Sequence, residues 1–169
     1  MFKTTINSIY LSELKYKQRW TKAYILLLAI AISLSAYGVS AQASKNLTID
    51  RDMIDQPLTI EGISGGTTSA QEITQTENTA TGYCDGYVQP QPNHLLKLES
   101  FFEFLRLEVR SPVDTTILIK GPGGVWCNDD AGTANPMIEG QWQPGIYQVW
   151  IGSYQADSNN EYEIKIRAK

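Results

Sequence analysis

Oxygen-bearing side chains gather in the turns of the C-terminal half of this sequence. They are three aspartates and two asparagines: Asp114, Asn128, Asp129, Asp130 and Asn135. Ca²⁺ takes about 6–8 oxygen ligands from carboxylates, amides and backbone carbonyls, so these residue types predict a calcium site. The alternative role is architectural, because Asp and Asn also hold turns by bonding to nearby backbone groups. The spacing is not that of an EF-hand loop, and both interpretations stay open.

The two cysteines, Cys84 and Cys127, predict a disulfide if the chain is exported. The catalytic alternative would use Cys127 as a nucleophile and His94 as its base. Such a site also needs an orienting third group and an oxyanion element, and the sequence indicates neither. With one histidine and two cysteines in the chain, zinc fingers and histidine-rich metal sites are excluded.

Large aromatic residues are the third group with binding chemistry: Trp126, Trp142, Tyr147, Trp150 and Tyr154. In one interpretation they line a sugar- or peptide-binding face. Strand alternation places Trp150 opposite Tyr147, so an exposed Trp150 beside Tyr154 would be the candidate surface-binding pair. In the other interpretation the large rings fill the core of a small domain.

Short strands separated by turns must position all of these groups. Alternating apolar residues and β-branched runs, each ended by Pro, Gly, Asn or Asp, predict the strands. They cover residues 105–110, 115–120, 125–127, 136–142, 146–154 and 161–167. The turn at 121–124 makes a hairpin, which brings Asp114 and Asp129 to the same side. We predict an all-β fold, an antiparallel β-sandwich of jelly-roll type.

Several turn and strand motifs follow one another in a fixed order. They are Ser-Pro-Val-Asp at 111–114, Gly-Pro-Gly-Gly at 121–124, Cys-Asn-Asp-Asp at 127–130, Asn-Pro at 135–136, and the run from Pro144 to Tyr154. This ordered set resembles the bacterial pre-peptidase C-terminal (PPC) domain family over residues 83–169. The resemblance implies a collagen-binding-domain-like sandwich that serves secreted proteases as a non-catalytic accessory module. No peptidase domain precedes the motifs here, so we expect a stand-alone secreted module.

The organisation of the chain follows from charge and composition. Five basic residues and one acidic residue precede an uncharged stretch, 23–41, that ends in small residues. We expect a signal peptide over 1–43, with an uncleaved N-terminal anchor as the alternative. Residues 44–82 contain no aromatic residue, which predicts a flexible leader with one edge strand over 57–61. Residues 83–169 are then the β-sandwich domain.

Net charge limits the partners. Beyond residue 43 the chain has 9 Lys and Arg against 17 Asp and Glu, a net charge of −8, compared with −4 for all 169 residues. This acidity disfavours nucleic acids and anionic membranes. We expect contact with a membrane only during export or through an uncleaved anchor.

Three functional hypotheses remain. The first is a secreted, non-catalytic binding module, stabilised by calcium, that attaches to a periplasmic or extracellular protein or polysaccharide. The second is a small secreted hydrolase that uses the acidic loop, although the adjacent side chains of Asp129 and Asp130 diverge unless a metal gathers them. The third is an accessory or inhibitor partner of a separately encoded protease.

Overall fold

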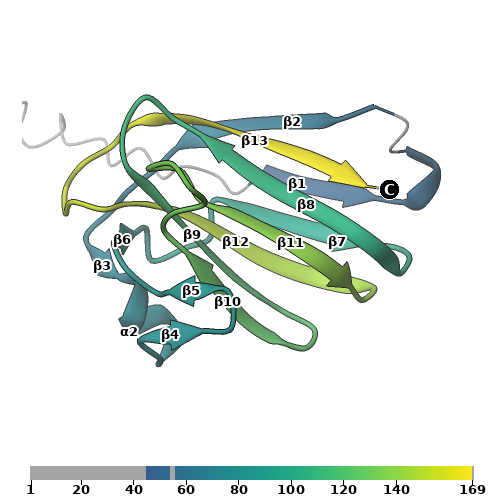
Figure 1. The fold of residues 1–169 in the computed structure, drawn as a ribbon, viewed down its shortest axis with the longest axis horizontal. Coiled ribbons are helices and arrows are strands. Elements are labelled where there is room, and N and C mark those ends of the chain that lie inside the picture. Colours follow the sequence, from purple (N-terminus) through teal and green to yellow (C-terminus); the bar gives the residue numbers. More distant parts are fainter. Residues whose placement is uncertain (1–44, 54–55, 169) are drawn as a thin grey trace, which may run out of the picture. The chain divides into compact units, whose positions relative to one another are not determined.

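The structure, a computed structural model, describes residues 45–53 and 56–168. The predicted signal segment, 1–43, lies outside these residues. Within the described ranges, no helix is both long enough and apolar enough to cross a membrane. All described residues belong to one compact unit, and Figure 1 shows it as two stacked layers of strands with a smaller group of elements at one side.

Sheet A is the seven-stranded layer, and β12 lies at its centre. β12 pairs with β9 along one edge and with β7 and then β6 along the other; β10 continues beyond β9, β1 beyond β7, and β3 beyond β6. The strands are β1 (Lys45–Ile49), β3 (Thr68–Ser69), β6 (Tyr87–Val88), β7 (His94–Leu98), β9 (Thr115–Gly121), β10 (Gly124–Asn128) and β12 (Gly145–Ser153). The β1–β7 pair is parallel, and the other pairs of this sheet are antiparallel.

Sheet B is the four-stranded layer, in the order β11-β8-β13-β2. Its strands are β2 (Leu58–Ile63), β8 (Phe102–Arg110), β11 (Met137–Trp142) and β13 (Glu161–Ala168). All three pairs are antiparallel. β2 forms one edge and overlaps the edge strand expected over 57–61.

The main core lies between the two sheets and follows strand alternation. On β8, β12 and β13, every second residue points inward and is buried: Leu105, Leu107, Val109; Tyr147, Val149, Ile151; Tyr162, Ile164, Ile166. These are the inward faces that the sequence pattern predicts. The structure thus confirms the predicted all-β sandwich.

The structure differs from the expected flexible leader over 44–82. β1 and β2 of this range pair within the sheets, and a short 3-10 helix, η2 (Arg51–Met53), follows β1. Residues 64–92 add the short strands β3 and β6 to sheet A, and the rest of this segment lies over the outer face of the sheet. We call residues 64–92 the cover; besides β3 and β6 it contains α2 (Ala70–Thr74), β4 (Asn78–Thr79) and β5 (Gly82–Tyr83), which lie beside β9 and β10 in Figure 1.

A second, smaller apolar cluster attaches the cover to sheet A. Cys84 and Val88 from the cover pack with Leu118, Cys127 and Trp150 from the outer face of the sheet. Backbone groups hold the cover as well, since Gly65 N–H donates to the Ile151 carbonyl at 3.0 Å. The cover lacks aromatic residues other than two exposed tyrosines, Tyr83 and Tyr87, and yet it is ordered, because sheet A supplies the large side chains beneath it.

Candidate functional site

A groove of about 330 Å³ opens between the two sheets where edge strand β10 meets edge strand β11. It is lined by the β9–β10 turn, by Trp126 and Tyr147, and by residues 138–143. Both edges are free of further strands in the described sheets, so the groove can be reached from solvent. Three of the five aromatic residues singled out in the sequence meet here.

The aromatic rings of the groove pack against one another. Trp126 stacks on Trp142, with ring centroids 6.1 Å apart and planes at 24°. Trp142 contacts Tyr147 with centroids 4.8 Å apart. Trp142 and Tyr147 are buried, whereas Trp126 is partly exposed. One indole face therefore stands on a fixed aromatic floor.

Hydrogen bonds fix the two rings of the floor. Trp142 Nε1–H donates to the Leu105 carbonyl at 3.0 Å, and the Tyr147 hydroxyl donates to the Gln143 carbonyl at 2.9 Å. Burial raises the pKa of Tyr147 above its ordinary value, although the bond to Gln143 acts in the opposite direction. The hydroxyl therefore stays protonated at neutral pH and keeps its bond.

Glycines shape the groove. A Cβ at Gly121 would lie 2.2 Å from the Tyr147 ring, and one at Gly145 would lie 2.4 Å from Pro122. These two positions let the ring and the turn approach the backbone closely. Gly140 differs from these two glycines, because a Cβ there would lie in open space, with no atom within 4 Å.

The rim of the groove is polar but carries no unbalanced charge. Glu139 is held by Arg106 of the neighbouring strand, whose Nε and Nη2 lie 2.6 and 2.5 Å from the same carboxylate oxygen. Gln141 and Gln143 are exposed neutral amides. The rim thus offers hydrogen-bond donors and acceptors, which suits a neutral polar ligand.

The two asparagines expected to bind calcium hold loops together. Asn128 donates from Nδ2 to the Thr81 carbonyl and accepts the Met137 N–H at Oδ1. Asn135 accepts from the Thr115 hydroxyl and donates from Nδ2 to the Ser111 carbonyl. Asn128 therefore connects the cover to β11, and Asn135 anchors the loop that precedes β11.

The three aspartates of the expected calcium site influence one another. Asp114 has a raised pKa, first because of burial and then because of the charges of Asp130 and Asp129. Within residues 45–53 and 56–168, no group of three or more His, Cys, Asp or Glu side chains is placed to hold a metal ion. Because the amides are already engaged, the expected set of five ligands is reduced to three carboxylates, and calcium there stays a prediction.

The expected surface pair of Trp150 and Tyr154 needs correction. Trp150 does point away from the main core, as alternation requires, but it is only 4% exposed because the cover lies over it. Tyr154 is 54% exposed and follows the end of β12. Among the tryptophans in the described part of the chain, the partly exposed one is Trp126, which the sequence pattern does not distinguish from the other aromatic residues. Its signal was the tight turn just before it, which places it on an edge hairpin.

The Cys84–Cys127 disulfide is confirmed. The sulfur atoms are bonded at 2.07 Å, and both residues are 1% exposed. The bond joins the cover to β10. His94 lies apart from it in the core, with Nε2 2.6 Å from the Tyr162 hydroxyl, so it cannot act as a base for Cys127.

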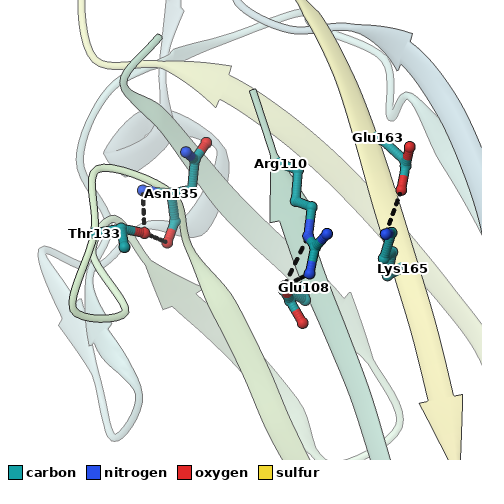
Figure 2. Close-up of polar contacts among 6 residues, drawn as sticks. All are labelled: Glu108, Arg110, Thr133, Asn135, Glu163 and Lys165. Atoms are coloured by element: carbon teal, nitrogen blue, oxygen red, sulfur yellow. Dashed lines mark hydrogen bonds and ion pairs between the residues drawn. The ribbon is translucent and has the colours of Figure 1, made fainter. Parts of the chain in front are cut away.

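The outer face of sheet B carries pairs of oppositely charged side chains. Figure 2 shows Glu108 bonded to Arg110 on β8 and Glu163 paired with Lys165 on β13. The guanidinium of Arg110 lowers the pKa of Glu108, and this hydrogen bond outweighs the opposing effect of burial. Beside this row, Figure 2 also shows Thr133 and Asn135 bonded to each other within the loop before β11.

Two clefts flank Arg110 on this face. One, of about 540 Å³, is lined by residues 61–63 of β2, residues 161–163 of β13, Arg110 and Pro112, and includes three carboxylates. The other, of about 430 Å³, lies between β8 and the loop before β11. Glu61 is directly opposite Glu163 in the β2–β13 register, so two like charges face the first cleft.

Comparison with known proteins gives few relatives. No protein-family model matches the sequence. Over 88 residues the chain is 27% identical to an uncharacterized protein of Synechococcus elongatus, and the match covers 50% of this chain and 65% of that protein. The chain thus spans less than two thirds of that relative's length.

Similar solved structures include two proteins of low sequence identity. The pre-peptidase C-terminal domain of a collagenase from Bacillus anthracis has a TM-score of 0.43 at 11% identity, covering 76% of this chain and 100% of that one. PliG from Aeromonas hydrophila, a periplasmic inhibitor of g-type lysozyme, has a TM-score of 0.43 at 10% identity, covering 75% and 100%. The family that the sequence motifs resemble is therefore represented among the structures similar to this chain.

Proposed function

We propose that this chain is an exported, non-catalytic binding module that attaches to polysaccharide through the groove between β10 and β11. The observation that carries the proposal is the partly exposed indole of Trp126, stacked on a buried and hydrogen-bonded aromatic floor. Pyranose rings present apolar C–H faces and a hydroxyl edge. Such a ring can lie on Trp126 while its hydroxyls reach the neutral amides of the rim.

Preorganisation supports this use of the groove. Trp142 and Tyr147 cannot turn without losing their hydrogen bonds, so little conformational entropy is lost when a ligand binds. Arg106 is paired with Glu139, so the rim has no free cation. The chain beyond residue 43 has a net charge of −8. Both features disfavour anionic polysaccharides and leave neutral ones as the ligand class.

Retention on polysaccharide tests the proposal. Protein purified from the exported fraction of an expressing host would be applied to cellulose, chitin and xylan, with pectate as the anionic comparison. We expect retention on a neutral polymer and an affinity at least about tenfold lower in Trp126→Ala, as for aromatic residues at the centre of binding sites. Tyr154→Ala is the matched control, because it removes an exposed ring at the opposite end of β12. Retention that is unchanged in Trp126→Ala would contradict the proposed site.

A second candidate partner is a protein with basic side chains. It is favoured by the cleft beside β2, where Glu61, Glu161 and Glu163 outnumber Arg110. Opposed carboxylates raise each other's energy, and a lysine or arginine from a partner would relieve that repulsion. Binding of Lys/Arg-rich peptides that weakens with salt and in Glu61→Gln would support this candidate. Binding that is insensitive to both would eliminate it.

Calcium is proposed in a structural role only. Burial, and after it the charges of Asp130 and Asp129, raise the pKa of Asp114. A cation bound among the three carboxylates would relieve the part that is due to repulsion. The proposal is independent of the groove, which contains none of these residues.

A further inference from the structure

Strand β2 has one unpaired edge. It pairs with β13 along one side, and no described strand pairs with its other side. The Ser64 N–H, just after β2, donates to the Asn160 carbonyl at 2.8 Å and continues the β2–β13 register. In an antiparallel pair, residues that bond to the partner strand alternate with residues that do not. The residues of β2 that bond to β13 are therefore the even-numbered ones, 58, 60 and 62.

The odd-numbered residues of β2 direct their backbone groups toward the free edge. At Ile63 the carbonyl is in use, because the Asn93 side chain donates to it from Nδ2 at 3.0 Å. Thr59 and Glu61 are exposed, and within residues 45–53 and 56–168 their backbone groups on this edge have no hydrogen-bond partner. Each residue has one N–H and one C=O, so this edge offers donors and acceptors in the geometry of a strand.

Other edges of the two sheets are less open. The β10 edge is occupied at Cys127, whose N–H donates to the Thr79 hydroxyl and whose carbonyl accepts from the Thr81 hydroxyl. β11 has a register shift between Gly140 and Trp142, and such irregularities protect an edge from pairing with another chain. β2 keeps its register throughout and contains neither proline nor lysine. It lacks these protective features, so an added strand can pair with it.

The outer face beside this edge is negatively charged. Glu61 and Glu161 line the cleft of about 540 Å³ and form no ion pair within the described part of the chain. Arg110, the cation of the cleft, is already bonded to Glu108. On an added strand, the side chain directly opposite Glu61 would lie on this same face, with about 5 Å between the Cβ atoms. A lysine or arginine there would meet an unpaired carboxylate.

The inner face of the same edge is apolar. Ile60 belongs to the main core, and Leu58 is partly buried against that core. Side chains of a strand alternate between the two faces of a sheet, so every second side chain of an added strand would lie on this inner side. An apolar side chain there would remove more of Leu58 from water. The edge therefore suits a strand in which basic and apolar residues alternate.

We propose that β2 binds an extended segment of a partner protein in which lysine or arginine alternates with apolar residues. The segment adds to sheet B as a further strand, and its backbone bonds to Thr59 and Glu61. This inference rests on the basic protein partner proposed above as the second candidate, and it specifies how that partner binds. A second copy of this chain is a poorer occupant, because its own β2 would bring another Glu61 to the same acidic edge.

A short, fluorescein-labelled peptide in which valine and lysine alternate tests the inference. Fluorescence anisotropy measures its affinity for the exported protein at physiological salt. Two further versions carry N-methyl groups, one on its valine amides and one on its lysine amides. In either strand direction only one of these sets of amides faces β2, so one version should lose at least about tenfold in affinity and the other should bind like the parent peptide.

Variants at two positions locate the binding edge. Thr59→Pro removes an N–H that faces the free edge, so it spares the ladder to β13 while its ring obstructs an added strand. It should lower the affinity at least about tenfold, whereas the matched control, Thr59→Val, should bind like the wild type. Glu61→Gln should weaken binding up to about fivefold and reduce its dependence on salt. Melting temperatures are recorded for each variant, and the methylated peptides decide the question if Thr59→Pro does not fold.

The outcomes separate the mode of binding from the class of partner. Equal binding of both methylated peptides, or unchanged binding by a folded Thr59→Pro, would overturn strand addition and leave a basic partner standing. Failure of every lysine peptide to bind would overturn both. A dimer in sedimentation that is lost in Thr59→Pro would show that a second copy occupies the edge, and would overturn the proposal. Polysaccharide binding is tested separately, because the groove contains no residue of β2.

Discussion

Removing the Cys84–Cys127 disulfide should cost this domain a large part of its stability. The two residues are 43 positions apart in the sequence. In the chain-entropy description, closing a loop of this length removes roughly 13 cal/mol/K from the unfolded state, or about 4 kcal/mol at 25 °C. For a domain of roughly 120 residues this corresponds to a fall in melting temperature of about 15 °C. The variant is Cys84→Ala/Cys127→Ala, because serine would bury two hydroxyl groups.

Thermal unfolding followed by circular dichroism measures this loss, and Thr81→Val is the matched control. The Thr81 hydroxyl donates to the Cys127 carbonyl at 2.8 Å, so it joins the cover to β10 at the same place without closing a covalent loop. Its loss should cost only about 1 kcal/mol. A reducing agent should destabilise the wild-type protein and leave the double variant unchanged. If the double variant melts no lower than Thr81→Val, the disulfide does not act through loop closure.

The remaining predictions concern the loops and the charges. Asn135→Ala leaves two neighbouring loops without their hydrogen bonds and should destabilise the domain by about 2 kcal/mol, measured by urea unfolding; an unchanged midpoint would show that the loops are held in other ways. The lowered pKa of Glu108 means that its pair with Arg110 stabilises the fold above the ordinary carboxyl pKa and is lost as the pH falls through the lowered value. Glu108→Gln should therefore weaken the acid dependence of stability, and an unaltered profile would contradict this assignment. The raised pKa of Asp114 has the opposite sign: the ionised group destabilises the fold above its raised pKa, and the penalty vanishes below 3.8. The Asp114→Asn variant should therefore have a higher melting temperature than the wild type at neutral pH. Ca²⁺ should raise the melting temperature of the wild type only. A calcium titration that gives neither heat nor a thermal shift would refute calcium binding.

The strands of the sandwich could be predicted because each carries its own pattern. Apolar residues alternate along Phe102–Arg110 and Glu161–Ala168, and alternation fixes which face is buried whatever the partner strand is. The cover could not be predicted in this way. Residues 64–92 have few large side chains of their own, and they are ordered by a disulfide and by contacts with Leu118 and Trp150 of the sheet. These contacts cannot be predicted from the amino-acid composition of residues 64–92 alone.

The candidate site likewise combines features that a local sequence pattern predicts with contacts between distant segments that it does not predict. Strand alternation correctly predicts that Trp150 points away from the main core. Its ring is nevertheless buried, because the cover packs against it. The groove requires Trp126 and Trp142 to meet, and these residues belong to different sheets. No local pattern tells which two edge strands lie together. The asparagines show a third limit, because the same amide can bind a cation or a backbone group, and only the folded chain shows which backbone groups are in reach.

The place of β13 in sheet B has a consequence for the order of events during biogenesis. β13 lies between β8 and β2, so the pairing of Ile60 with Ile164 joins segments near opposite ends of the described chain. Sheet B cannot be completed, and the inner face of sheet A cannot be fully covered, until Glu161–Ala168 is available. Contacts over such long separations in sequence form slowly. During synthesis the sandwich would therefore be completed only after Glu161–Ala168, the last described strand, has been made.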